Sequence, residues 1–489
     1  MDHQSRIRHL LRRFGLGATL SEVRHLSKME LSEAFEYLLD YDEVSEPYPI
    51  SPWEFSTNTN NDKINSSGRL FSDWWALKMA TTRRPLQEKI ALFWHDHFAV
   101  SDIKIQDGRK MISYLQILRR NATGNFRTML REISKEPAMV LFLDSHRNVK
   151  GTPNENFARE VMELFTLGEG NYEESDVLEA ARAFTGWSFR DTLNYRERDR
   201  LNEQIRAKVN NGESIFVFRN IPGRHDVGTK TIFGKEGNFT GDDVLSMLLD
   251  HPQTARYICY KLWEWFAYPN PDDALVERLA KVFRESDYEI KPVLRAIAFS
   301  PEFWSKKAVR TKVKSPVDYT IAAMRQFNAS AVLAKRDSGE LDQFTPIDGT
   351  VRRFASIVNR EMRRQGMSLL NPPSVEGWHW NEEWVTSETM THRIDLSRRI
   401  FGNRRIIEPL IEWTAPELAV EQGEGDHAKL VDRLLELLDV EVSREQRWIL
   451  VGAARRYGGN GVIYDTRKAV PMLRDMLKLV FAMPEAHIC

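Results

Sequence analysis

The sequence predicts a mainly α-helical protein, one large multi-helical unit with a small β-hairpin insertion. Three observations support this fold class. Apolar residues recur at helical spacing through most of the 489 residues. Proline opens several of these stretches, at the first helical turn where its missing N–H costs nothing. Strand-like runs are confined to one short region. We expect helices at 85–98, 110–121, 126–134, 153–167, 176–184, 242–265, 292–299, 350–364, 430–438, 444–456 and 467–481.

The remaining stretches define the organisation of the chain. Residues 56–68 are rich in Asn and Ser and predict a loop, and residues 190–210 carry ten charges and predict an exposed insertion. The runs 214–219 and 230–233 flank a glycine-containing turn and predict a hairpin. Residues 421–426 are typical of a linker. We therefore expect a helical domain over 1–400, with a β-containing insertion at about 187–240, and a C-terminal helical region over 401–489.

Composition excludes several functional classes. With 69 Lys and Arg against 70 Asp and Glu, the chain is not a globally basic nucleic-acid binder, and we expect no nucleic-acid partner. Two cysteines are too few for a disulfide framework or a Cys-ligated zinc site. No apolar stretch is long enough for a membrane span. The arginine pair near residue 12 resembles a twin-arginine export signal, but charges interrupt the residues after it, so we expect no signal peptide and a cytoplasmic location.

Two histidines in the segment 94–98 are candidate metal ligands. An H-x-H pair shares a metal readily on a strand, but on a helix two such rings point about 200° apart. His95 and His97 can therefore share a metal only if the helix ends before them. Otherwise His97 faces the core and His95 faces outward, and both interpretations stay open.

The polar face of the helix predicted at 153–167 is a candidate acid–base site. Asn156, Glu160 and Glu163 project together, so they could hold a cation or raise the pKa of one carboxyl group for general-acid work. The alternative is an ordinary solvated face, because Arg159 has a glutamate four residues to either side. We expect Thr152 to cap this helix.

Two loops add further candidates. His225, Asp226 and Lys230 would place a base, a carboxylate and a cation in the hairpin turn, although any turn can hold such residues. The segment 371–378 combines two prolines and a glycine, so it predicts a rigid loop. Trp378 in this loop would either stack on a ligand or seal an interface between helices.

Eight segments together resemble the bacterial family called domain of unknown function 1800, in order from about residue 6 to residue 400. The resemblance implies little chemistry. Members are often envelope proteins encoded beside a second family that looks like sulfatases and phosphatases, which implies such a protein as a partner. Val227 and Thr229 stand where the family commonly has an acidic residue and a proline, which weakens a metal role for this loop. The matching segments are HLLRRFGLGAT (9–19), PLQEKIALFWHDHFAVS (85–101), NFRTMLREISKEPAMVLFLD (125–144), NENFAREVMELFTLGEGNYEESDVLEAARAFTGW (154–187), HDVGTKTIFG (225–234), KLWEWF (261–266), VKSPVDY (313–319) and NPPSVEGW (371–378).

Two functional hypotheses fit these residues. The first is a hydrolase, with a divalent metal ion as the cofactor that its histidines could hold, acting on a polar polymer or an anionic ligand. The second is a non-catalytic helical scaffold in which the same polar residues form a structural network for binding a partner. Convergence of these residues on one open cleft would favour the enzyme. The assigned roles are catalysis for Glu160, Glu163 and Asp226; substrate binding for Asn154, Asn156, Arg159, Lys230, Trp187 and Trp378; and metal binding for His95, His97 and His225.

Overall fold

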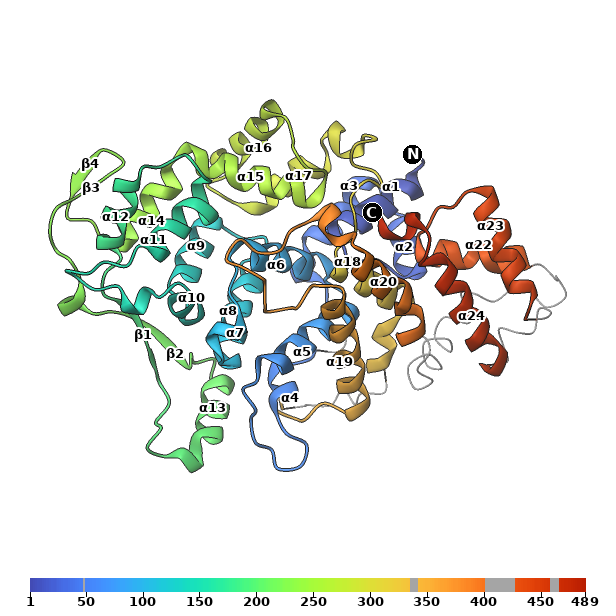
Figure 1. The fold of residues 1–489 in the computed structure, drawn as a ribbon, viewed down its shortest axis with the longest axis horizontal. Coiled ribbons are helices and arrows are strands. Elements are labelled where there is room, and N and C mark those ends of the chain that lie inside the picture. Colours follow the sequence, from blue (N-terminus) through green and yellow to red (C-terminus); the bar gives the residue numbers. More distant parts are fainter. Residues whose placement is uncertain (47–48, 335–341, 401–426, 458–465) are drawn as a thin grey trace.

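The computed structural model describes residues 1–46, 49–334, 342–400, 427–457 and 466–489. It confirms the mainly α-helical fold class: helices form nearly all of the described elements, together with two antiparallel two-stranded sheets (Figure 1). The centre of the molecule is built around α6, which packs against α5 and α8, while α18 and α19 cover α5. These central helices are α5 (Gly68–Thr81), α6 (Pro85–His97), α8 (Gly108–Arg120), α18 (Pro316–Gln326) and α19 (Gly349–Arg364).

The chain begins and ends on the same side of these central helices, opposite the sheets (Figure 1). Before the central helices, the chain forms α1 (His3–Phe14), α2 (Leu20–Leu26), α3 (Leu31–Leu39) and α4 (Pro52–Ser56). A short helix, α7 (Asp102–Ile105), connects α6 to α8. The last helices are α20 (Ser387–Ile400), α22 (His427–Leu438), α23 (Arg444–Arg455) and α24 (Thr466–Val480).

The other side of the molecule holds the predicted acid–base helix and both sheets (Figure 1). The helices between residues 126 and 298 are α9 (Phe126–Ser134), α10 (Pro137–Phe142), α11 (Asn156–Met162), α12 (Glu174–Ala183), α13 (Leu201–Asn210), α14 (Gly241–Asp250), α15 (Pro252–Phe266), α16 (Asp273–Glu285) and α17 (Ile290–Ala298). Strand β1 (Trp187–Asp191) pairs with β2 (Phe216–Asn220), and β3 (Lys230–Ile232) pairs with β4 (Lys235–Gly237).

The predicted pairing of 214–219 with 230–233 is wrong. Strand β2 pairs with β1, and a helix lies between these two strands in the sequence. Strand β3 pairs with β4, which follows it after a short turn. The insertion expected at 190–210 is largely exposed, as predicted, and its second half forms the helix α13, which was not predicted. The helix predicted at 242–265 is two helices, α14 and α15, because Pro252 begins a new first turn after the break at His251.

The C-terminal helical region packs against the beginning of the chain. Arg12 on α1 forms an ion pair with Asp439, the residue after α22, at 2.6 Å. The backbone N–H of Cys489 donates to the carbonyl of Lys312 at 2.9 Å. The predicted boundary at residue 400 and the predicted linker at 421–426 fall at or within residues 401–426, outside the described residues.

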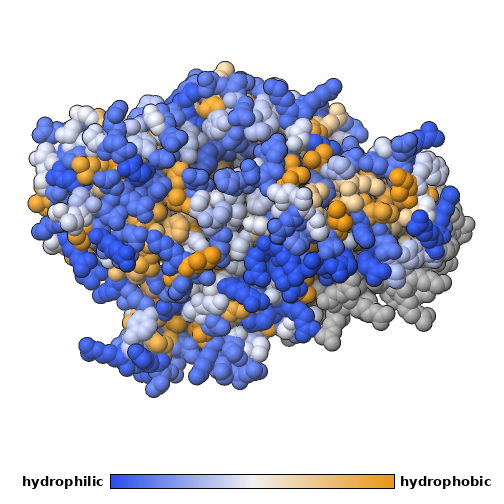
Figure 2. Space-filling model, viewed as in Figure 1, coloured by the Kyte–Doolittle hydropathy of each residue, from blue (hydrophilic) through white to orange (hydrophobic). Residues whose placement is uncertain are grey.

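The core includes four indole rings with almost no exposed surface, those of Trp74, Trp75, Trp94 and Trp263. Helix α6 is buried on all sides, so the expectation of an outward-facing His95 is wrong: its exposed fraction is 0%. Hydrophilic residues cover most of the face shown in Figure 2, with apolar residues scattered between them. Within the described part of the chain, no helix combines the length and apolar character needed to cross a bilayer.

Candidate functional site

The start of α11 is fixed by two asparagines. The side chain of Asn154 accepts a hydrogen bond from the backbone N–H of Asn156 at 3.0 Å, and the N–H of Asn154 donates to Oδ1 of Asn148 at 2.9 Å. The helix therefore begins at Asn156, three residues after the expected start, and the expected cap at Thr152 is wrong. Asn154, which we expected to bind substrate, contributes to this turn.

Helix α11 ends in a π-helical turn, Glu163–Leu167, which the sequence pattern did not reveal. The hydroxyl of Thr166 donates to the carbonyl of Val161, five residues back, and Gly168 ends the turn at a φ of 77°. Single π-turns inside helices widen the backbone and occur often at functional sites. Here the turn sets the direction of Glu163, which the hydroxyl of Tyr172 holds by donating a hydrogen bond.

Glu160 is a partly buried carboxyl group without a partner. Among the described residues it accepts no hydrogen bond and forms no ion pair. Burial raises the pKa of Glu160 to about 7, the nearby carboxylates of Glu163 and Glu376 add to the rise, and Arg159 opposes it. We call Glu160, Glu163 and Glu376 the carboxylate trio.

Arg159, the cation nearest to the trio in the sequence, already forms ion pairs with other carboxylates. Arg159 pairs with Glu174 on α12 at 2.8 Å and with Glu155 at 3.2 Å. Its guanidinium lowers the pKa of Glu160, but less than burial and Glu163 together raise it. The trio therefore gathers negative charge that Arg159 does not neutralise.

Two side chains of α15 lie beside this site. Tyr257 packs on the end of the π-turn, since a Cβ at Gly168 would lie 3.0 Å from the Tyr257 ring. Burial raises the pKa of the Tyr257 hydroxyl, and the charge of Glu163 adds to it. The Lys261 ammonium lies 5.6 Å from the centre of the Tyr257 ring, and burial lowers its pKa.

Asp96, between the two candidate histidines, holds the loop that carries Glu376. Its carboxylate accepts the backbone N–H of Trp378 at 2.7 Å and the indole N–H of Trp380 at 2.9 Å. Gly377 has a φ of 90°, and a Cβ there would lie 2.4 Å from an Asp96 oxygen. Burial raises the pKa of Asp96 to about 6, against the opposing charge of Lys261.

The two histidines point to different neighbours, as expected for a helix. Nδ1 of His95 lies 2.9 Å from the Tyr114 hydroxyl, and Nε2 of His97 lies 3.2 Å from the carbonyl of Phe165 in the π-turn. Burial lowers the pKa of His95 to about 3 and the pKa of His97 well below its ordinary value. Both rings are therefore neutral at physiological pH.

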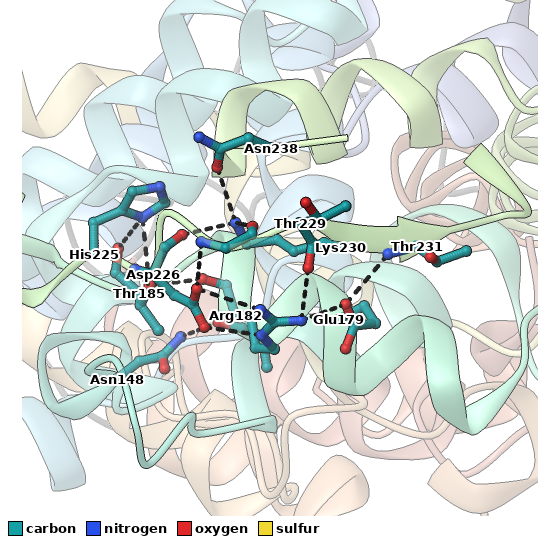
Figure 3. A network of polar contacts seen from close by, with 12 residues as sticks. Asn148, Glu179, Arg182, Thr185, His225, Asp226, Thr229, Lys230, Thr231 and Asn238 are labelled. Atoms are coloured by element: carbon teal, nitrogen blue, oxygen red, sulfur yellow. Dashed lines mark hydrogen bonds and ion pairs between the residues drawn. The ribbon is translucent and has the colours of Figure 1, made fainter. Parts of the chain in front are cut away.

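His225, Asp226 and Lys230 belong to a separate network (Figure 3). Arg182 donates to Asp226 at 2.8 Å, and the Lys230 ammonium donates to the carbonyl of Asp226 at 2.7 Å. Nδ1 of His225 lies 3.0 Å from the carbonyl of Thr185. Arg182 lowers the pKa of Asp226, which keeps that carboxylate ionised and paired. Among the described residues, no hydrogen bond or ion pair joins this network to the carboxylate trio.

The two tryptophans assigned to substrate binding are core residues. Trp187 is 2% exposed and packs against Phe157 and Phe184. Trp378 is 4% exposed, and its ring meets His95 edge-on at 5.2 Å between centres. Within the described ranges, no group of three or more His, Cys, Asp or Glu side chains is arranged to hold a metal ion.

Comparison with known proteins identifies a family. The family model described as "Protein of unknown function (DUF1800)" matches residues 9–488. The chain belongs to this family. The DUF1800 match continues through the C-terminal helical region, beyond the residue-400 limit of the resemblance drawn from the sequence. No curated protein and no solved structure matches the chain.

In this DUF1800 chain, four residues of the site lay outside the sequence assignments. Asp96 stands between His95 and His97, and only these two histidines were assigned a role in that segment. Glu376 stands one residue before Gly377 in the rigid loop. Tyr257 and Lys261 are four residues apart, which places them on one face of a helix. Nothing in the local sequence links these four positions, because they come from three distant segments.

Proposed function

We propose that this protein is a hydrolase in which Glu160 serves as the general acid–base group, acting on a neutral, polar polymer. The observation that carries the proposal is an unpaired, partly buried carboxyl group beside two other carboxylates. A general acid works best when its pKa lies near the working pH. The pKa of about 7 for Glu160 lies near neutral pH, so both its protonated and its ionised forms are accessible there.

The trio supports a division of labour between two carboxyl groups. Glu160 in its protonated form donates its proton to the leaving group, and water adds to the other side of the broken bond. Glu163 is held by the hydroxyl of Tyr172, so its orientation is fixed. In its ionised form it takes the proton from the attacking water. Two neighbouring carboxyl groups in different surroundings commonly take such acid and base roles.

Charge selects the substrate class. The trio repels phosphate, sulfate and carboxylate groups, because Arg159 is already paired with Glu155 and Glu174. Of the two substrate classes expected from the sequence, a neutral polar polymer therefore suits the site better than an anionic ligand. The proposal uses no metal ion, because His225 lies in a network apart from His95 and His97.

A second candidate function is a non-catalytic scaffold that binds a partner protein. The network around Asp226 favours it, because Arg182, Thr185 and Lys230 satisfy the turn without any ligand. Fully satisfied polar networks specify a fold on their own. In this alternative the sulfatase- or phosphatase-like protein implied by the family resemblance would be the partner.

Carbodiimide labelling tests the state of Glu160. A water-soluble carbodiimide with an amine nucleophile modifies protonated carboxyl groups, and mass spectrometry measures each site. At pH 7 we expect Glu160 to react more than Glu174, whose pKa is lowered by Arg159. The Glu163→Gln variant removes a neighbouring charge that raises the pKa of Glu160, so its Glu160 should react less. Equal labelling of Glu160 and Glu174 contradicts the proposal.

Turnover tests the assignment directly. The full chain is incubated with uncharged polysaccharides and with their sulfated or carboxylated counterparts, and release of reducing ends is measured. We expect hydrolysis of uncharged chains, lowered about 10²- to 10⁴-fold in Glu160→Gln. Glu285→Gln, a matched change at an exposed position on α16, should retain activity. Hydrolysis that survives Glu160→Gln excludes Glu160 as the acid.

A further inference from the structure

A second region with unexplained polar groups lies on the other side of the molecule from the carboxylate trio. A small pocket of about 30 Å³, open to solvent on one side, lies where α1 meets α18 and the C-terminal region. Its charged lining consists of Arg8, Arg12, Lys314, Asp318 and Asp439, and Cys489 also lines it. None of these residues has a role in the proposed hydrolysis.

Both carboxylates of the pocket already have cationic partners. Asp439 is shared by three arginines: Arg8 at 3.6 Å, Arg12 at 2.6 Å and Arg310 at 3.1 Å. Asp318 pairs with the ammonium of Lys89. Asp439 and Asp318 are therefore already paired and are not available as partners for the other cations nearby.

Those other cations contact no carboxylate within the described residues. The Lys314 ammonium donates to the carbonyl of Ala486 at 2.9 Å and forms no ion pair. Burial lowers the pKa of Lys314 to about 8. Arg13, which is 2% exposed, donates to the carbonyl of Ala308 and to Sγ of Cys489, the latter at 3.7 Å. Buried cations are rarely left without an anionic partner.

One donor at the pocket is entirely unused. Nε of Arg12 is buried and has no acceptor among the described residues. The whole Arg12 side chain is only 8% exposed, so water does not readily replace the missing acceptor. An unsatisfied buried donor costs about 1–3 kcal/mol. An oxygen acceptor at this position would remove the cost, and its negative charge would add to that of Asp439, which already acts on Lys314.

We infer that this pocket binds a small oxyanion of the phosphate or carboxylate class, which accepts hydrogen bonds from Lys314 and from Nε of Arg12 beside Cys489. Guanidinium and ammonium groups together are a common environment for such anions, because each bond is charge-assisted. The occupied pocket would join α1, the segment before α18 and the C-terminal region. The inference is independent of the proposed hydrolase.

Protection of a thiol reports occupancy at this place in the fold. The full chain is alkylated with iodoacetamide at constant ionic strength, with increasing inorganic phosphate or succinate, and mass spectrometry monitors each cysteine. We expect saturable slowing at Cys489. The other cysteine, Cys259, is 0% exposed and serves as the internal control, whose modification reports unfolding instead. Phosphate and succinate as separate series distinguish the two anion classes.

A charge-neutralising variant tests the residues. Lys314→Gln should weaken binding of the protecting anion at least tenfold, the equivalent of losing one charge-assisted hydrogen bond. Lys281→Gln removes the same charge from an exposed position on α16 and should leave protection unchanged. The wild-type protection series tests the inference even if Lys314→Gln folds poorly. No saturable protection up to about 10 mM of either anion, or equal protection by chloride, overturns it, as does unchanged protection in Lys314→Gln.

Discussion

The carboxylate of Asp96 accepts the backbone N–H of Trp378 at 2.7 Å, although the two residues are 282 positions apart in the chain. Its second oxygen accepts the indole N–H of Trp380 at 2.9 Å. This residue thus ties the last turn of α6 to the loop that brings Glu376 towards Glu160. Positioning of the carboxylate trio depends on a buried aspartate, while the histidines on either side of it pack in the core.

Removal of the Asp96 carboxylate should destabilise the protein. In Asp96→Ala, the N–H groups of Trp378 and Trp380 lose their acceptor, and each buried unsatisfied group costs about 1–3 kcal/mol. We expect the free energy of unfolding to fall by about 2–5 kcal/mol, measured by urea denaturation. Asp96→Asn keeps one acceptor and should lose less. Equal stability of Asp96→Ala and the wild type would show that these bonds contribute nothing.

The same residue predicts a pH dependence. Folding raises the pKa of Asp96 from 3.8 to about 6, chiefly through burial, so the folded protein retains the proton more strongly than the unfolded chain. The contribution of Asp96 to stability is therefore full below pH 3.8 and is lost as the pH rises towards 6, by up to about 3 kcal/mol. Asp96→Asn has no such proton. The stability of the wild type relative to Asp96→Asn should fall between pH 4 and pH 6 in denaturation curves; a constant difference contradicts the shift.

Elements with local signals were predictable from the sequence. The helix predicted at 126–134 is confirmed to the residue as α9, because Asn125 caps it by accepting the N–H groups of Arg127 and Thr128. The strand pairing was not predictable in this way. Twenty-four residues separate the end of β1 from the start of β2, so no short turn signals their pairing.

The candidate site shows the same limit. Glu160 and Glu163 share a helix, so helical spacing alone placed them together. The loop of Glu376 is held near them partly by Asp96, and that contact is invisible to any local pattern. The loop at His225 looked equally polar in the sequence, but its groups are satisfied by Arg182 and Thr185. Polar residue types predict chemistry only when their partners are known.

Because Gly377 lies close to Asp96, we expect the substitution Gly377→Ala to destabilise the protein strongly. Gly377→Ala meets two penalties: a φ of 90° and a Cβ only 2.4 Å from an Asp96 oxygen. Gly151→Ala meets the first alone, because its φ is 86° and nothing lies within 4 Å. The backbone penalty is about 1–2 kcal/mol, and overpacking adds about 1–3 kcal/mol. Urea denaturation should therefore show a larger loss for Gly377→Ala, and equal losses would mean that the loop moves away at no cost.

A shared metal at His97 and His225 is tested by a double-mutant cycle. The ring of His97 faces the carbonyl of Phe165, whereas His225 faces the carbonyl of Thr185, and no hydrogen bond or ring contact among the described residues connects the two histidines. Effects of independent sites on the free energy of unfolding add within about 0.3–0.5 kcal/mol. We therefore expect His97→Gln and His225→Gln to be additive in urea denaturation, with and without a chelator.

A metal held by both histidines would give a different pattern. The first substitution would already release the ion, so the second would cost much less than it does alone. The interaction energy would then exceed about 1 kcal/mol and would disappear in the chelator. His146→Gln provides the control, because the only hydrogen bond of that ring among the described residues is with the carbonyl of Val140, at 3.3 Å. Coupling of His97 to His225, without coupling of either to His146, would restore the metal-assisted form of the hydrolase hypothesis.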